Sequence, residues 1–352
     1  SRKEGRSIWE APLSLSSANL RPLLADLLPG DLPKQALKRA DLKATITLDG
    51  ETLRIAGLNG NIDATRLSGQ MERRAGTPAR WTFGLRLGTL NVADYLPPTS
   101  KGGKSQPWRL DWMKGIDVEG PLAAERLIIF GIPHTDFSAP LRLQNGVLSA
   151  DPIRARVAGG SAGAGVRAEA TSGGLLGRLR YTLENVNALT LSKERGQSQL
   201  LSGTGSLDAD VSGLLRSGAD IPAALTGTLG FTLRNGELDA GHPGTFSSFR
   251  SLGATGTLSK GILTTRDLHL DGTLTVRGYG TINLLNWTLD YRLNVSGPGF
   301  PTLPVRYYGS LDKPQRSINA QGFLAKTFGS LGNGFLTILD RVVFAPLRFL
   351  VP

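Results

Sequence analysis

The stretch LTGTLGFTLRNGELDA, residues 225–240, decides the fold class of this chain. Leu225, Leu229, Phe231 and Leu233 alternate with Thr, Gly and Arg, which is the period of a β-strand with one apolar and one wet face. Asn235-Gly236 follows, and this dipeptide supplies the positive φ angles of a tight hairpin turn. The stretch therefore predicts a hairpin in an antiparallel sheet.

The same alternation returns along the chain, at 42–48, 81–87 and 287–295. Four more turn dipeptides lie between alternating runs, at 49–50, 59–60, 145–146 and 271–272. LRLQNGVLSA (141–150) and GTLSKGILTT (256–265) repeat the pattern of strand, turn and strand. The chain is therefore predicted to be mainly β, an elongated antiparallel sheet bent into an open apolar trough.

Helices are predicted to be few and short. Asn19 could cap a helix over 20–28, Asp31 could cap one over 33–40, and 91–96 could form a single turn. The C-terminal tail differs, because apolar residues recur there at three- and four-residue spacing. We expect this tail, residues 321–352, to be an amphipathic helix.

The predicted organisation has four parts. Residues 1–98 form the first part of the trough with two short helices, and 109–320 continue it as repeated hairpins. Between them, 99–108 is a polar and basic stretch that acts either as a linker between two modules or as a long loop in one sheet. The repeated hairpins favour the loop. The helical tail, 321–352, completes the chain.

Composition excludes several classes of protein. The 352 residues contain 40 Lys and Arg against 29 Asp and Glu, a net charge of +11 that favours anionic partners. There is no cysteine, which excludes disulfides, thiolate nucleophiles and Cys-ligated metals. The basic residues are spread along the strands instead of forming a track with exposed aromatics, so we expect no nucleic-acid partner.

Signals for catalysis are weak. His134, His242 and His269 are scattered, and Asp208 and Asp210, which share a strand face, have no third ligand at useful spacing. We therefore expect no enzyme activity, no catalytic residue, no metal and no cofactor.

Several motifs, taken in order, resemble the AsmA family of bacterial envelope proteins. They include the run from 20 to 71, LGTLNVADYLPP (87–98), the run from 139 to 170 and LSGTGSLDADVSGLL (201–215). The block from 254 to 295 and LPVRYYGSLDKPQ (303–315) resemble the family's closing strands and the turn before its tail.

The resemblance implies a periplasmic protein of a Gram-negative bacterium, held at the inner membrane by an N-terminal helix that this chain lacks. It also implies a β-trough that carries phospholipids between the inner and outer membranes and supports outer-membrane homeostasis. The family has no catalytic residues to transfer. The alternative is a non-enzymatic scaffold or assembly factor for outer-membrane proteins, which recruits its partners by strand addition.

Two sets of residues are candidates for function. The predicted lining of a phospholipid-binding trough is Trp81, Phe83, Leu85, Leu229, Phe231, Leu233, Leu289, Tyr291 and Leu293. The predicted contacts of the tail with a membrane surface or an envelope protein are Phe328, Leu331, Phe335, Ile338, Leu339, Arg341 and Arg348. The tail could equally cover an open edge of the sheet. The apolar strand faces could also meet one another in a closed core, which would leave no lining.

Overall fold

A computed structural model describes most of the chain. The described residues are 2–3, 6–24, 36–95, 107–196, 201–217, 221–239, 246–298, 300–311 and 313–318. The predicted helical tail lies outside them, as does most of the predicted linker.

Within the described residues the chain forms nineteen strands. They are β1 (Arg2–Lys3), β2 (Arg6–Ser17), β3 (Ala40–Asp49), β4 (Thr52–Ile62), β5 (Thr65–Arg74), β6 (Ala79–Asn91), β7 (Ile116–Ile129), β8 (Ile132–Gln144), β9 (Val147–Val157), β10 (Gly160–Thr171), β11 (Gly174–Asn187), β12 (Thr204–Leu215), β13 (Thr226–Asp239), β14 (Phe246–Ser259), β15 (Ile262–Gly272), β16 (Thr275–Asn283), β17 (Thr288–Gly297), β18 (Phe300–Ser310) and β19 (Gln315–Ile318).

The helices are short. They are the 3-10 helices η1 (Arg21–Leu24), η2 (Val92–Asp94) and η3 (Asp111–Lys114) and the α-helices α1 (Ala188–Glu194) and α2 (Ile221–Ala224). Asn91 caps η2 by accepting a hydrogen bond from the Ala93 N–H, which confirms the predicted single turn there. The helix predicted over 33–40 is wrong at its end, because Ala40 begins β3.

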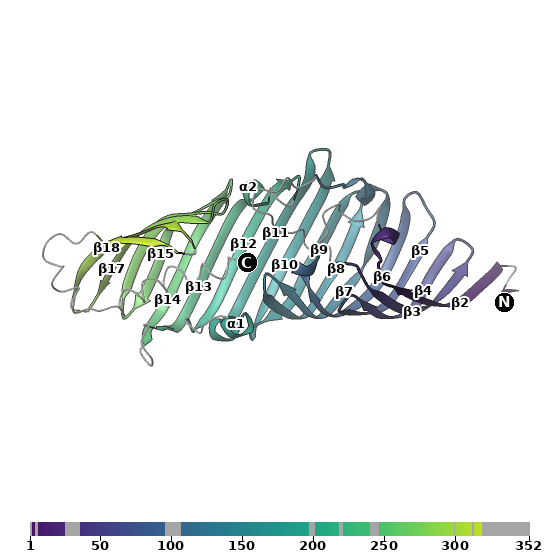
Figure 1. Ribbon diagram of the computed structural model, residues 1–352, viewed down its shortest axis with the longest axis horizontal. Helices are drawn as coiled ribbons and strands as arrows, with labels where there is room; N and C mark the ends of the chain where they lie inside the picture. The colour runs from purple at the N-terminus through teal and green to yellow at the C-terminus, as the bar shows by residue number, and fades with distance from the viewer. Residues whose placement is uncertain are drawn as a thin grey trace. The chain divides into compact units, whose positions relative to one another are not determined.

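The strands make an open, mainly antiparallel sheet, which confirms the predicted fold class. The chain divides into two structural units. Unit 1 comprises 1–156, 162–180 and 212–221, and unit 2 comprises 157–161, 181–211 and 222–352. Figure 1 shows the strands of unit 1 from β2 to β9 and those of unit 2 from β13 to β18, each set side by side in chain order.

One strand pair departs from the predicted meander. β6 and β7 are parallel, with Trp81 opposite Val118 and Leu87 opposite Ala124. A parallel pair needs a connection that returns the chain to the same end of the sheet, and residues 92–115 are long enough to do so. β6, β7 and the described ends of the segment between them, 92–95 and 107–115, all belong to unit 1.

Two of the predicted turns are wrong. Asn235-Gly236 lies inside β13 and Asn59-Gly60 lies inside β4. Asn235 has φ +51°, and a Cβ on Gly236 would lie 2.4 Å from Cζ of Phe249. Asn235 and Gly236 therefore form a local irregularity within β13, and the missing side chain of Gly236 leaves room for the ring of Phe249. The turns at 49–50 and 145–146 do connect adjacent strands.

Candidate functional site: an apolar sheet face

The candidate site is one face of the sheet in unit 1, made by alternate side chains of β2 to β8. Side chains of residues opposite each other on adjacent strands project to the same side, so the register arranges them in four rows. From the β3–β4 turn inwards, the rows are Trp9, Leu48, Leu53, Arg73, Trp81, Val118 and Leu143; Ala11, Ile46, Ile55, Met71 and Phe83; Leu13, Ala44, Leu58, Gly69, Leu85, Leu122 and Ala139; and Leu15, Leu42, Gly60, Leu67, Leu87, Ala124 and Phe137. We call these rows the unit 1 face.

The part of the unit 1 face made by β2 to β6 is only partly buried. In its first row Trp9 and Leu48 are exposed, at 59% and 43% of their surfaces. Trp81 and Phe83 are half-buried. Large apolar side chains in these positions leave hydrocarbon surface in contact with water, which costs about 25 cal/mol per Å².

The partial burial has a simple cause in the described residues. The apolar cluster of this face is centred on Ala44, Leu58 and Leu67, and the described apolar side chains that pack against them also belong to β2 to β6. Neighbours in the same sheet shield one another at the sides but leave the tops of the side chains bare. No second apolar layer from the described residues packs over this cluster.

The two margins of the unit 1 face are different. Beside the first row, Met113 of η3 packs against Leu143 and Val118, but only over the part made by β7 and β8. At the opposite margin the connection between β2 and β3 is fastened to the sheet. Leu20 and Ala36 are buried there, and Leu20 N–H donates to the Leu37 carbonyl at 3.0 Å.

Asp63 fastens this second margin. Its carboxylate accepts hydrogen bonds from the backbone N–H groups of Leu37, Lys38 and Arg39 at 2.7–2.9 Å, and from the Tyr95 hydroxyl at 3.0 Å. Burial would raise the pKa of Asp63, but these four donors together lower it. Burial and the bond to Asp63 raise the pKa of Tyr95 to about 12. The carboxylate is therefore a structural acceptor.

The opposite side of the same strands is polar and carries ion pairs. Glu72 accepts from Arg54 Nε at 2.9 Å and from Arg74 Nε at 2.7 Å, and Arg80 pairs with Glu119. All of these residues alternate with members of the unit 1 face. The strands are thus divided into one apolar face and one charged face.

Unit 2 shows the same alternation with a different result. Its face brings together residues from β13 to β18, and the register aligns Leu233, Leu252, Leu270, Val276, Val295 and Leu303 in one row. Of these, Leu252, Val276, Val295 and Leu303 are fully buried, at 0% exposure. The Tyr291 hydroxyl donates to Thr265 Oγ1 inside the cluster at 3.2 Å, and burial raises the pKa of Tyr291. This face is a closed core.

The predicted lining residues divide between the two faces. Trp81, Phe83 and Leu85 lie on the unit 1 face and are half-buried. Leu289, Tyr291 and Leu293 lie in the closed core of unit 2, at 2–4% exposure. Leu233 is also buried, whereas Leu229 and Phe231 are partly buried against that core. That these residues bind lipid stays a prediction.

Sequence reasoning missed several members of the unit 1 face. Ile55 and Met71 stand beside Phe83 in the second row. Neither belongs to a long alternating run, because β4 carries Gly57 at φ +62° and a register shift, and β5 alternates with charged residues. Only the strand pairing identifies them. The predicted contacts of the tail, from Phe328 to Arg348, lie outside the described residues.

Of the residues considered for catalysis, His134, Asp208, Asp210 and His269 are described, whereas His242 lies outside the described residues. His134 is buried in β8, where burial lowers its pKa and its Nδ1 lies 3.0 Å from the Ile132 carbonyl oxygen. Asp208 lines a shallow hollow of about 160 Å³ in unit 2 with Asp267 and His269. There, Asp267 accepts from Thr255 N and Oγ1 at 2.7 and 2.6 Å. Across the described residues, no group of His, Asp and Glu side chains has a geometry that could hold a metal ion.

Comparison with known proteins identifies part of the chain. The model of the AsmA family matches residues 98–268, which is just under half of its length. Residues 98–268 are an AsmA-family segment. The match confirms the predicted resemblance and spans β7 to β14 with most of β15. The AsmA family is associated with assembly of the bacterial envelope and outer membrane.

No curated protein and no solved structure matches the chain. Among the described residues no helix combines the length and the apolar character needed to cross a bilayer.

Proposed function

We propose that this protein is a non-enzymatic lipid carrier of the bacterial envelope, and that the unit 1 face holds the acyl chains of phospholipids. We place it in the periplasm, where lipid must cross water to pass between the inner and outer membranes. The AsmA family's association with envelope assembly supports this role. The observation that carries the proposal is the partly exposed apolar face of β2 to β6.

The energetics favour a continuous surface over a specific pocket. Exposing an acyl chain to water costs about 0.8 kcal/mol per CH₂ group, so a two-chain lipid with about 30 such groups faces about 20 kcal/mol. Rows of Leu, Ile, Met and aromatic side chains offset that cost wherever an acyl chain lies along them. No directional chemistry is required.

A crosslinking experiment tests the proposal. A photoreactive amino acid is placed at Phe83, on the unit 1 face, and in a matched variant at Thr82, the next residue on the polar face. After irradiation in cells, we expect phospholipid adducts at position 83 and few or none at position 82. Equal labelling at the two positions, or none at either, would contradict lipid carriage by this face.

The closed core of unit 2 supports a second candidate function. A strand assembly with a fully buried interior is rigid, and a rigid assembly suits a scaffold for outer-membrane proteins. The two candidates make different demands on the unit 1 face. A scaffold tolerates polar residues at Phe83 and Met71 without loss of function in cells, whereas a lipid carrier does not.

A further inference from the structure

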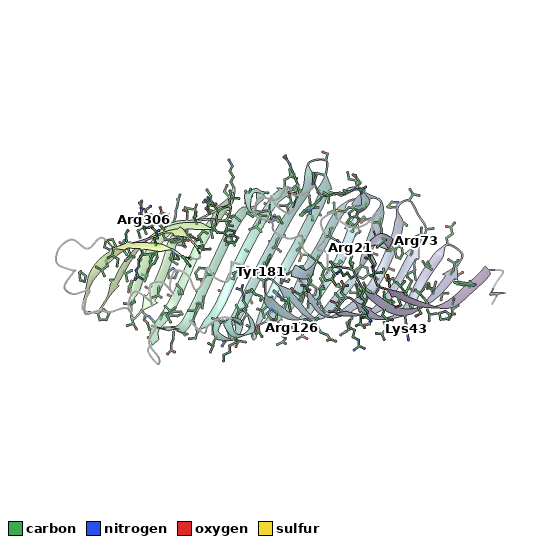
Figure 2. The ribbon with its side chains drawn as sticks, viewed as in Figure 1. Arg21, Lys43, Arg73, Arg126, Tyr181 and Arg306 are labelled. Atoms are coloured by element: carbon green, nitrogen blue, oxygen red, sulfur yellow. The ribbon has the colours of Figure 1, made fainter. Side chains whose placement is uncertain are left out.

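Arg73 is the one charged member of the unit 1 face. In the register of β4, β5 and β6 it lies between Leu53 and Trp81 in the first row. The other residues that β5 contributes to the four rows are Met71, Gly69 and Leu67, which are apolar or small. Figure 2 labels Arg73 among the side chains of unit 1. An arginine in this row interrupts an otherwise hydrocarbon surface.

The Arg73 guanidinium has no partner among the described residues. Glu72 is adjacent in sequence, but it lies on the opposite face and already accepts from Arg54 and Arg74. The Arg73 side chain is half-buried, and no described carboxylate pairs with it. A cation that is partly withdrawn from water gains most from an anionic partner, and guanidinium binds phosphate and carboxylate groups through two parallel hydrogen bonds.

The position of Arg73 suits the head of an amphiphile. The first row is the last before the turns at the near margin, so Arg73 lies at the edge of the apolar rows. Rows two to four extend about 20 Å from it, since alternate residues of a strand are about 6.8 Å apart. At the far margin Asp63 is saturated by four donors. An acyl chain on the rows therefore places an anionic head at Arg73.

We infer that Arg73 binds the anionic headgroup of an amphiphile whose acyl chains lie on the unit 1 face. This inference rests on the proposed lipid-carrier function and adds a preference for lipids with an accessible phosphate or carboxylate. The half-buried Trp81, which is opposite Arg73 in the same row, offers the headgroup an apolar ring with a polar edge.

The test compares two lipids that differ only in the phosphate. Phosphatidic acid and diacylglycerol, carrying the same fluorescent acyl chain, are titrated separately with the purified chain. We expect the wild type to bind phosphatidic acid about tenfold more tightly, as for one charge-assisted contact of about 1.4 kcal/mol. Arg73→Gln should remove this preference and leave diacylglycerol binding unchanged. Arg73→Lys should retain part of it.

Arg66 provides the matched control. It lies on the same strand, is exposed on the polar face and has no described ion-pair partner. Arg66→Gln makes the same change in net charge and should keep the full preference. An equal loss in Arg66→Gln would overturn the inference, since general electrostatic attraction would then explain the preference. Thermal unfolding followed by circular dichroism checks that both Gln variants are folded.

The remaining outcomes separate the inference from the function on which it rests. If the wild type binds both lipids equally and Arg73→Gln changes neither, Arg73 has no headgroup role, but lipid carriage stands. If the wild type binds neither lipid, the proposed function fails and the inference fails with it. If about 10 mM inorganic phosphate displaces phosphatidic acid completely, Arg73 belongs to a site for the free anion and the inference fails.

Discussion

The two apolar faces of this protein follow one sequence rule and differ in what covers them. In β2 to β6 of unit 1 the buried centre of the apolar cluster consists of Ala44, Leu58 and Leu67, and Trp9 on the same face is 59% exposed. In unit 2 the described cluster has large side chains at or near 0% exposure, such as Leu252 and Tyr307. Alternation along the strands produces an apolar face in both units. Whether that face is buried depends on the side chains that pack against it.

Glycines on the strands of unit 2 help to explain its closure. A Cβ on Gly278 would lie 2.3 Å from Cδ2 of Leu293, and one on Gly280 would lie 2.6 Å from Cγ of Tyr291. Leu293 and Tyr291 therefore lean over the bare backbone of β16, the neighbouring strand. Large side chains that occupy the space above a neighbouring glycine pack the surface at high density. Gly278→Ala and Gly280→Ala would force these side chains to move.

The largest expected effect compares one substitution in both units. Leu293→Ala removes a side chain that is 2% exposed and should lower the free energy of unfolding by about 2–5 kcal/mol. Leu85→Ala, on the half-buried unit 1 face, should cost about 1 kcal/mol, because folding buries less of the Leu85 side chain than of Leu293. Urea denaturation followed by circular dichroism measures both. Equal costs would show that the two faces are buried alike.

A charge on the open face should affect binding more than stability. Phe83→Asp places a carboxylate where an acyl chain is proposed to lie and should weaken lipid binding at least about tenfold. The half-buried position lets the carboxylate reach water, so the urea midpoint should fall less than it does in Leu293→Asp. Fluorescent lipid titration and urea denaturation of the same sample separate the two effects. Leu293→Asp is the contrasting variant and should unfold unit 2.

The Asp63 contacts predict a dependence on pH at the far margin of the unit 1 face. The folded state lowers the pKa of Asp63 from 3.8, so its contribution to stability is complete at neutral pH and is lost as pH falls through the lower, folded value. Asp63→Asn should cost about 1 kcal/mol at pH 7 through weaker hydrogen bonds. The difference from wild type should shrink at acid pH. The urea midpoints of both proteins at pH 7 and at about pH 2.5, which is below the ordinary pKa of 3.8, measure this difference. A constant difference would contradict this assignment.

The smallest effect should come from the charged faces, and it should be alike in both units. Asp290 accepts from Arg306 Nε and Nη2 at 2.9 and 2.7 Å in unit 2, much as Glu72 accepts from Arg54 and Arg74 in unit 1. These pairs are exposed to water and screened by salt. Asp290→Asn and Glu72→Gln should each shift the urea midpoint less than Leu85→Ala does. A larger shift at low salt in one unit alone would reveal a network there.

Part of the fold and of the candidate site was predictable from sequence. The alternation at 81–87 places Trp81, Phe83 and Leu85 on one face of β6, and strand pairing confirms that they share it. The Asn235-Gly236 turn was not predictable from its residues, because the same dipeptide forms an irregularity inside β13. A positive φ at Asn235 suits a hairpin turn as well as an irregularity within a strand. The close approach of Phe249 to Gly236 shows that the second applies here. Arg73 was missed because its row depends on the register of β4, β5 and β6.

The sequence by itself determined the strands, the absence of cysteine chemistry and the division of each strand into an apolar and a polar side, since side chains alternate strictly along an extended backbone. Tertiary structure decided the parallel pairing of β6 and β7, because the path of a long connection is not encoded in a two-residue period. It also decided that Leu293 is buried and that Leu85 is half-exposed. Both are leucines on an apolar strand face, and only the atoms brought from elsewhere in the chain make them different.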